Sequence, residues 1–432
     1  MDSFPEVSAM RQTCLLILLL VTGCALPTAA PPAPTDSRRT AGATGADCDA
    51  DNGGLALPAE FCAVLVGSTL GPVRELAVAP NGDLYAAVKA DREGRGGGVL
   101  AFRDTSGDGR PDQRESFGPG GGNDVEVHEG YLYFARNDEI VRWRLPAGRL
   151  APEGDPERIV AGLPADGGHV AKSIAFDGDV MYVNIGSRTN SCQRDDRVSG
   201  SPGEDPCTEL ERRAGIWTFP ASRPGQSFAD GARFATGLRN AMALAVHPVS
   251  RALYAAVHGR DQLAQNWGFS AEVNANNPAE IFGRIARGDD FGWPYCHYSN
   301  EHRRTVLSPE YGGDGAAEGR CASVAQPLIA FPGHWAPLAL AFYPGDAFGT
   351  KYRGGAFVAW HGSWNRDPLP QEGYRVVFVP FRDGVPTGEY ETFAADASSA
   401  TALRASGLAV APDGALYIAA DRNAKIWRVV RR

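Results

Sequence analysis

The sequence predicts an all-β protein: a six-bladed β-propeller whose blades are four-stranded antiparallel sheets. Three observations predict this fold. A short apolar pattern recurs along the chain, which is typical of repeat architectures. No helical segment of about 10 to 15 residues separates the copies, as a parallel α/β fold would require. The 52 glycines and 31 prolines suit many short strands joined by turns.

The repeats define the blades. The clearest copies are residues 76–85 (LAVAPNGDLY) and 408–417 (LAVAPDGALY). Each copy has a short apolar strand, a turn, and a second strand that ends in small residues. The full set of copies starts at residues 76, 125, 174, 244, 340 and 408. Residues 61–66 precede the first copy, and we expect them to supply an outer strand to the last blade, so that no edge stays open.

The N-terminus indicates export. Residues 14–21 are apolar but shorter than the roughly 20 residues that cross a bilayer, and residues 21–24 (VTGC) resemble a lipobox. We therefore expect a lipoprotein signal peptide at 1–24, a flexible Pro/Ala-rich tether at 25–47 and the propeller at 48–432. Lipidation of Cys24 would anchor the protein to a membrane, facing the periplasm or the cell exterior. The alternative is ordinary signal-peptide cleavage near Ala30.

Charge and cysteine content narrow the class further. A formal net charge of −9 gives no basic footprint for nucleic acid. Six cysteines remain beyond the signal peptide, an even number that suggests disulfides in an exported chain. Local pairing is the simplest of the 15 possible connectivities, and it gives Cys48–Cys62, Cys192–Cys207 and Cys296–Cys321.

The strand register predicts one functional face, which we call the mouth. Segments that enter an inner strand lie on the same face as segments that leave the second strand. The mouth thereby collects four of the eight histidines and at least six arginines in an acidic protein. Such a ring of cations indicates a small polyanionic ligand near the axis. Its residues include Arg74, His169, Arg239, Asn240, His334, Arg404 and the segments 187–188, 258–261, 361–366 and 421–422.

Three segments of the chain carry a family resemblance. Residues 237–240 (GLRN), 291–294 (FGWP) and 361–366 (HGSWNR) resemble signature segments of the soluble quinoprotein glucose/sorbosone dehydrogenases. The likeness runs from about residue 61 to the C-terminus and is nearer the sorbosone/pyranose branch. It implies a pyrroloquinoline quinone (PQQ) cofactor with Ca²⁺, oxidation of an aldose, sugar aldehyde or related pyranose, and electron transfer to a cytochrome or quinone.

The resemblance also implies residue roles. His169 would be the general base, and Arg239 would stabilise negative charge on the reduced quinone. The Gly186-Ser187 pair stands where glucose-oxidising relatives carry Gly-Asp, so His169 is expected to lack a carboxylate partner. The expected cofactor contacts are Arg74, Asn240, His334, Trp364, Arg366 and Arg404, with Gly259 and Arg260 offering backbone carbonyls to Ca²⁺.

A second calcium site is predicted from spacing alone. An EF-hand-like loop runs from residue 104 to 115, with Gly109 at its sixth position. We expect it to cap the hairpin between the third and fourth strands of the first blade, on the face opposite the mouth. The alternative is an Asp/Gly-rich turn without metal. The expected ligands are Asp104, Ser106, Asp108, Arg110, Asp112 and Glu115.

Two other functions stay open. A propeller of this kind can serve as a non-catalytic carbohydrate-binding or scaffold protein, or as a Ca²⁺-dependent lactonase. The arginine-rich mouth argues against the lactonase, whose metal needs carboxylate and amide ligands. The sequence contains no HExxH, no GxGxxG that leads into a helix and no nucleophile elbow, which disfavours zinc proteases, Rossmann dehydrogenases and α/β-hydrolases.

Overall fold

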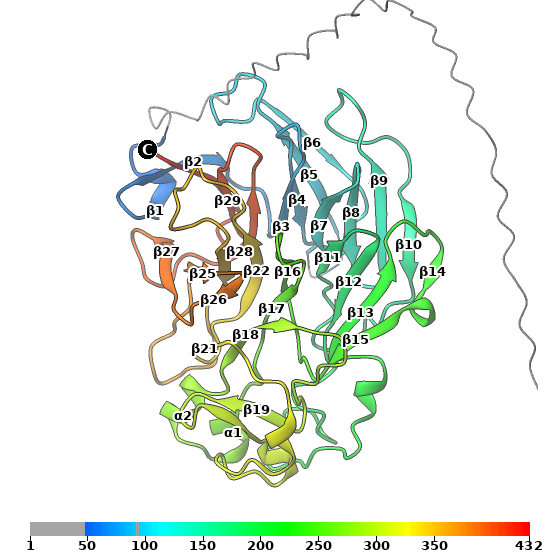
Figure 1. Cartoon of the computed structure of the whole chain (residues 1–432), viewed down its shortest axis with the longest axis vertical. Helices are drawn as coiled ribbons and strands as arrows, with labels where there is room; N and C mark the ends of the chain where they lie inside the picture. Colours follow the sequence, from blue (N-terminus) through cyan, green and yellow to red (C-terminus); the bar gives the residue numbers. More distant parts are fainter. Residues whose placement is uncertain (1–47, 92, 94) are drawn as a thin grey trace, which may run out of the picture. The chain divides into compact units, whose positions relative to one another are not determined.

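Six sheets surround a central channel (Figure 1). In this computed structural model the described residues are 48–91, 93 and 95–432. The predicted signal peptide, Cys24 and the tether lie outside them. From the inner strand outward, blade one is β3 (Val73–Val78), β4 (Leu84–Val88), β5 (Gly98–Arg103) and β6 (Gln113–Phe117), and blade two is β7 (Gly122–His128), β8 (Tyr131–Arg136), β9 (Glu139–Arg144), β10 (Glu157–Ala161) and β14 (Gln226–Ser227). Blade three is β11 (Ile174–Asp177), β12 (Val180–Ile185), β13 (Gly215–Pro220) and β15 (Ala232–Thr236), and blade four is β16 (Ala243–Val246), β17 (Leu253–Val257), β18 (Glu280–Ile285) and β21 (Ile329–Phe331). Blade five is β22 (Pro337–Phe342), β23 (Ala356–Trp360), β24 (Arg375–Val379), β27 (Glu391–Asp396) and β1 (Leu55–Ala56), and blade six is β28 (Ala405–Val410), β29 (Leu416–Ala420), β30 (Lys425–Arg431) and β2 (Phe61–Gly67).

The inner strands form a closed ring. Strands β3, β7, β11, β16, β22 and β28 contact one another in this order, and β28 returns to β3. The six-bladed propeller is therefore confirmed. Four-stranded blades hold for four of the six, because the short strands β14 and β1 add a fifth strand to blades two and five.

The N-terminal strand closes the ring as predicted. Strand β2 pairs antiparallel with β30, so residues from both ends of the described chain share blade six. The edge of the last blade is thereby covered, which removes a row of unpaired backbone groups that invites aggregation. The three predicted disulfides, Cys48–Cys62, Cys192–Cys207 and Cys296–Cys321, are also present.

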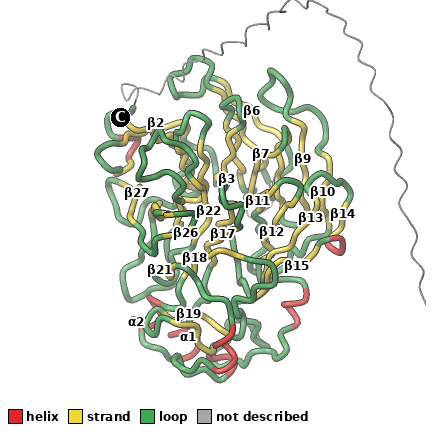
Figure 2. The backbone as a smooth tube through the Cα atoms, in the orientation of Figure 1, coloured by secondary structure: helices red, strands yellow, loops and turns green. Residues whose placement is uncertain are grey.

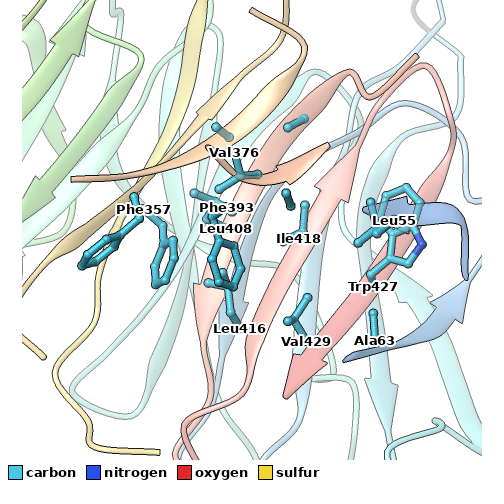
Figure 3. Close-up of a cluster of buried hydrophobic side chains, with 14 of the residues drawn as sticks. Leu55, Ala63, Phe357, Val376, Phe393, Leu408, Leu416, Ile418, Trp427 and Val429 are labelled. Carbon is cyan, nitrogen blue, oxygen red and sulfur yellow. The ribbon is translucent and has the colours of Figure 1, made fainter. Parts of the chain in front are cut away.

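The hydrophobic core is divided among the blade interfaces. One apolar cluster lies between each pair of neighbouring blades, because the alternating side chains of each sheet bury both of its faces. Figure 3 shows the cluster between blades five and six, with Trp427 beside Leu55 at one side, Phe357 at the other, and Phe393 and Ile418 between them. Every blade is thus held by its two neighbours.

One end of the propeller carries most of the irregular chain. Two short helices, α1 (Leu263–Trp267) and α2 (Ala271–Asn276), lie there beside the hairpin of β19 (Cys296–Ser299) and β20 (Arg304–Leu307), while β25 (Phe381–Arg382) and β26 (Val385–Pro386) form a separate hairpin. Figure 2 shows this end as mainly loops and helical turns beyond the strands. No helix in the described part of the chain is long and apolar enough to cross a membrane.

Candidate functional site

The predicted mouth contains side-chain contacts between blades and within them. Arg74 at the start of blade one forms an ion pair with Asp421 at the end of β29 in blade six, at 2.8 Å. Asp421 also accepts a hydrogen bond from His361, which follows β23 in blade five. Within blade four, Arg239 donates to the carbonyl of Gly259. The register prediction that brought these segments to one face is therefore confirmed.

His169 is held with one ring nitrogen free. Its Nδ1 lies 2.9 Å from both the carbonyl oxygen and the hydroxyl of Ser187. The Ser187 hydroxyl itself donates to the carbonyl of Thr189 at 2.7 Å, so it accepts from His169. Nδ1 therefore carries the proton, and Nε2 keeps a lone pair with no partner among the described residues. This tautomer leaves Nε2 available as a base.

His169 is a neutral imidazole because its surroundings disfavour the charged form. Burial, together with the nearby charge of Arg239, lowers the pKa of His169 to about 3. Ser187 occupies the place of a carboxylate partner, and no carboxylate of the described residues is hydrogen-bonded to the ring. His169 is consequently neutral at physiological pH, and its Nε2 carries a lone pair.

A glycine lets two site residues approach each other. A Cβ placed on Gly186 would lie 2.6 Å from the Cβ of His169 and 2.8 Å from Oδ1 of Asn240, closer than real Cβ atoms come. Asn240 is buried, and its Oδ1 accepts from Asn184 at 3.3 Å. Its Nδ2 group has no partner in the described part of the chain, so Asn240 keeps a donor for a ligand. The role of Gly186 was not predicted.

Arg239 belongs to a buried ion pair. It is 4% exposed and binds Asp261 at 3.1 Å, while Asn190 accepts two further hydrogen bonds from its guanidinium, each 3.0 Å long. Burial by itself would raise the pKa of Asp261, but the charge of Arg239 and the bond with His334 outweigh it and hold that pKa well below its ordinary value. Asp261 is therefore ionised, and it fixes Arg239 beneath the mouth. Sequence reasoning placed Asp261 at the mouth without assigning it a role, and it missed Asn190.

His334 and Arg366 do not offer donors to a ligand, contrary to prediction. The Nε2 of His334 contacts the carbonyl of Asn274 at 2.7 Å, and its Nδ1 faces Asp261 at 3.6 Å. Arg366 is 4% exposed, and its guanidinium donates to the carbonyls of Ala275, Gly333 and Pro370. Both side chains brace the loops around α2 instead. The positive or polar side chains of these two residues suggested contact with a ligand. Their burial and hydrogen-bond partners show that the N–H donors point into the protein.

Trp364 has the opposite environment. Its side chain is 61% exposed, in the loop that follows β23. The predicted role of Trp364 in covering the cofactor stays a prediction.

The two predicted calcium carbonyls lie in a region controlled by buried charges. The amide of Gly259 donates to Glu280, whose pKa is raised to about 7 by burial. The carbonyl of Gly259 accepts from Nη1 of Arg239 at 2.7 Å. The side chain of Arg260 pairs with Glu310, and both side chains are almost fully buried. A cation at Gly259 would therefore share this carbonyl with the positively charged Arg239. Metal binding here stays a prediction.

The predicted second calcium loop forms the hairpin between β5 and β6, where it was expected. Its carboxylates accept hydrogen bonds within the loop: Asp104 accepts from the amides of Gly107 and Gly109 at 2.7 and 2.6 Å, and Asp112 accepts from Thr105. Glu115 lies within β6, outside the turn. No group of three or more His, Cys, Asp or Glu side chains within the described ranges is arranged to hold a metal. Calcium binding by this loop stays a prediction.

Lys89 adds an unpredicted cation to the mouth. It follows β4 of blade one, and its pKa is lowered by partial burial and by the charge of Arg74, while Asp421 opposes the shift. Lys89 follows the second strand as Ser187 and His361 do in their blades, so the same register argument applied to blade one would have found it. Mutual repulsion of Lys89 and Arg74 favours an anionic ligand between them.

A small cavity lies directly behind the mouth. It has a volume of about 50 Å³ and is lined by Arg239, His258, Gly259, Trp293 and His297, among others. This is room for a few water molecules, since one water needs roughly 10–15 Å³ by the same measure. A ligand of several rings must therefore bind at the mouth itself and not in this cavity.

Comparison with known proteins supports the fold and defines the family. The family model described as TrAA12-like matches residues 119–432. A pyrroloquinoline quinone-dependent pyranose dehydrogenase of Coprinopsis cinerea is 27% identical over 249 residues, which cover 49% of this chain and 32% of that protein. The matches cover only about a third of the length of the curated relatives.

Solved structures show the same architecture. A Trichoderma reesei protein of carbohydrate-active enzyme family AA12 superposes with a TM-score of 0.72 at 16% identity, over 88% of this chain and 98% of that chain. The PQQ domain of the Coprinopsis cinerea pyranose dehydrogenase, in its holo form, gives a TM-score of 0.70 at 19% identity, over 87% and 97% of the two chains.

Proposed function

Since this chain belongs to the TrAA12-like family, we propose that it is a PQQ- and Ca²⁺-dependent dehydrogenase of an aldose or related pyranose that passes electrons to an external acceptor. One observation carries the proposal: a neutral histidine with a free Nε2 lies beside surplus cations at one end of a propeller channel. The named activity of the Coprinopsis cinerea relative supports this chemistry.

The residues present fit an anionic quinone cofactor. PQQ is a tricarboxylate, and Arg74, Arg404 and Lys89 supply cationic donors at the mouth. The free Nδ2 of Asn240 would add a neutral donor. Gly259 and Arg260 would offer backbone carbonyls to Ca²⁺, which prefers oxygen ligands. One structure of the Trichoderma reesei AA12 protein is a calcium structure, at 16% identity over 88% of this chain and 97% of that chain. When bound, the quinone supplies the carbon that accepts a hydride from the substrate.

The chain itself handles the proton and the charge. His169 would accept the substrate hydroxyl proton at Nε2, while its Nδ1–H stays donated to Ser187. The resulting imidazolium carries a proton on each nitrogen, and the nearby Asp261 carboxylate favours it electrostatically. Arg239, fixed by Asp261, keeps its positive charge beside the reacting atoms and stabilises developing negative charge. Trp364 would shield the site from water.

The proposal is tested by binding and turnover of the loaded protein. We expect PQQ to bind in millimolar calcium and a panel of aldoses to reduce an artificial electron acceptor. His169→Gln should lower kcat about 10²–10⁴-fold while PQQ affinity stays within a few-fold of wild type. His128→Gln, at the opposite end of the channel, is the matched control and should retain activity. A folded protein that binds no PQQ would refute the proposal.

We also infer that the protein works outside the cytoplasm, attached to a membrane through Cys24. The lipobox-like residues 21–24 and three disulfides in the exported part support this. Cys24→Ser should move the protein from the membrane fraction to the soluble fraction. Unchanged membrane association of this variant would contradict the inference.

A further inference from the structure

A histidine–aspartate pair, His361 and Asp421, lies between Arg74 of blade one and Arg404 of blade six. Nε2 of His361 is 2.8 Å from Oδ1 of Asp421, whose Oδ2 is 2.8 Å from Nη1 of Arg74. Burial acts to raise the pKa of Asp421, but His361 and Arg74 outweigh it and lower that pKa to about 2. Asp421 is thus ionised, and His361 donates to it from Nε2. The free position on the ring is Nδ1.

Arg404 covers this free nitrogen. Its Nη1 lies 3.4 Å from Nδ1 of His361 and 3.3–3.4 Å from the carbonyls of His361 and Gly362, and its Nη2 lies 3.3 Å from the hydroxyl of Tyr374. The guanidinium stacks over the Tyr374 ring, 4.5 Å from its centre. All these partners are neutral, and the contacts are long for charge-assisted hydrogen bonds.

The charges do not balance among the described residues. Arg74, Arg404 and Lys89 are three cations, and Asp421 is the one carboxylate within ion-pair distance of any of them in the described ranges. The second Nη group of Arg74 has no partner there either. An arriving carboxylate would therefore find an unused Nη group on Arg74, weakly engaged Nη groups on Arg404 and a surplus of positive charge.

The same arrangement keeps His361 neutral until an anion arrives. Burial lowers the pKa of His361 most; Asp421 opposes this, and the charges of Arg74 and Arg404 add to it. His258 and Tyr374 are the other titratable groups that face this cluster. A carboxylate bound to Arg74 and Arg404 cancels their effect and draws Arg404 away from Nδ1. The ring is then left with Asp421 and gains a proton more easily.

We propose that Arg74, Arg404, His361 and Asp421 form a carboxylate subsite that binds its anion together with one proton, which solvent delivers to Nδ1 of His361. The inference rests on the proposed function, because it assigns this subsite to a carboxylate of PQQ. Binding then strengthens as pH falls through the pKa of His361 in the loaded protein, and the gain levels off below its pKa in the empty protein.

The test is calorimetric titration of PQQ into the full chain with calcium, in buffers of different ionisation enthalpy. We expect uptake of up to one proton per PQQ, and tighter binding at about pH 6 than at about pH 8. In His361→Gln, which cannot be protonated, the uptake should disappear and affinity near pH 6 should fall about tenfold or more. Asp421→Asn should reduce the uptake as well, and it provides a second variant if His361→Gln does not fold. His128→Gln should keep wild-type uptake.

The outcomes separate the two proposals. PQQ binding without proton uptake, or with unchanged uptake in both His361→Gln and Asp421→Asn, overturns the subsite and leaves the dehydrogenase proposal intact. If PQQ does not bind at all, the dehydrogenase proposal fails, and citrate, a tricarboxylate without a quinone, becomes the probe. Citrate binding with a proton uptake that His361→Gln abolishes supports the subsite, and its absence overturns it.

Discussion

At the scale of single residues, the site depends on small side chains as much as on charged ones. Gly186 leaves the space in which His169 and Asn240 sit against the backbone of blade three. Ser187 supplies an acceptor to His169 where a carboxylate would raise its pKa. The base is therefore kept neutral and oriented, and its proton affinity is set by burial and by the neighbouring Arg239.

Gly186→Ala tests this packing. The added methyl group would overlap His169 and Asn240, so at least one of them must move. Because a displacement of about 1 Å costs roughly 100-fold in rate, we expect turnover to fall about that much while PQQ binding and the melting temperature change less. Gly345→Ala is the control, since a Cβ there has no neighbour closer than 3.9 Å. Equal activity of both variants would show that His169 is not tightly held.

At the scale of elements, the chain between β12 and β13 supports the cation at the centre of the site. Asn190 in this excursion accepts from Arg239 and donates to the carbonyl of Asp261. The disulfide Cys192–Cys207 closes the same excursion and packs against Trp293. The cross-link therefore lies two residues from a direct partner of Arg239.

Two disulfides that close loops of nearly equal size allow an effect on stability to be distinguished from an effect on function. Cys48–Cys62 and Cys192–Cys207 span 14 and 15 residues, so removing either should cost about 3 kcal/mol by the chain-entropy estimate. We expect both double Cys→Ser variants to melt at lower temperature. Only the variant lacking Cys192–Cys207 should also lose PQQ affinity, by about tenfold or more. Equal affinity of the two variants, measured below both melting temperatures, would contradict a role for this loop in holding Arg239.

At the scale of the whole molecule, the ring brings like charges together in the channel. Glu75 on β3 and Asp124 and Glu126 on β7 lie on neighbouring inner strands, and burial raises the pKa of all three. For Asp124 the pKa rises to about 7. The channel therefore holds a proton near neutral pH that the unfolded chain would release.

This channel should make the fold more stable in mild acid. The folded pKa of Asp124 is above its unfolded value, so its contribution is complete below about pH 4 and is lost as pH rises through about 7. Asp124→Asn removes the charge but keeps an oxygen for the amide of Ile174, which Asp124 now binds. We expect a higher melting temperature than wild type at about pH 8, by roughly 2–4 °C, and little difference below about pH 4. Asp383→Asn, in an exposed turn, is the control; a lower melting temperature of Asp124→Asn at both pH values would refute this account.

The sequence by itself determined the features that depend on local pattern. The repeats at residues 76 and 408 define blades, because a strand–turn–strand unit is encoded in about ten consecutive residues. Their register placed Arg74, His169 and Arg239 at one mouth, and close spacing paired the cysteines correctly. Residues 61–66 were assigned to the closing strand for the same reason: an apolar run outside the repeats must cover the remaining edge.

Only the tertiary structure decided what each mouth residue does. Arg366 and Arg404 look alike in sequence, yet one spends its donors on buried carbonyls and the other keeps weak contacts that an anion can displace. His361 gains its carboxylate partner from Asp421, 60 residues away, and Arg74 reaches the same group across 347 residues. Burial and charge pairing arise when distant blades meet as the ring closes, and those two quantities set protonation and ligand contact.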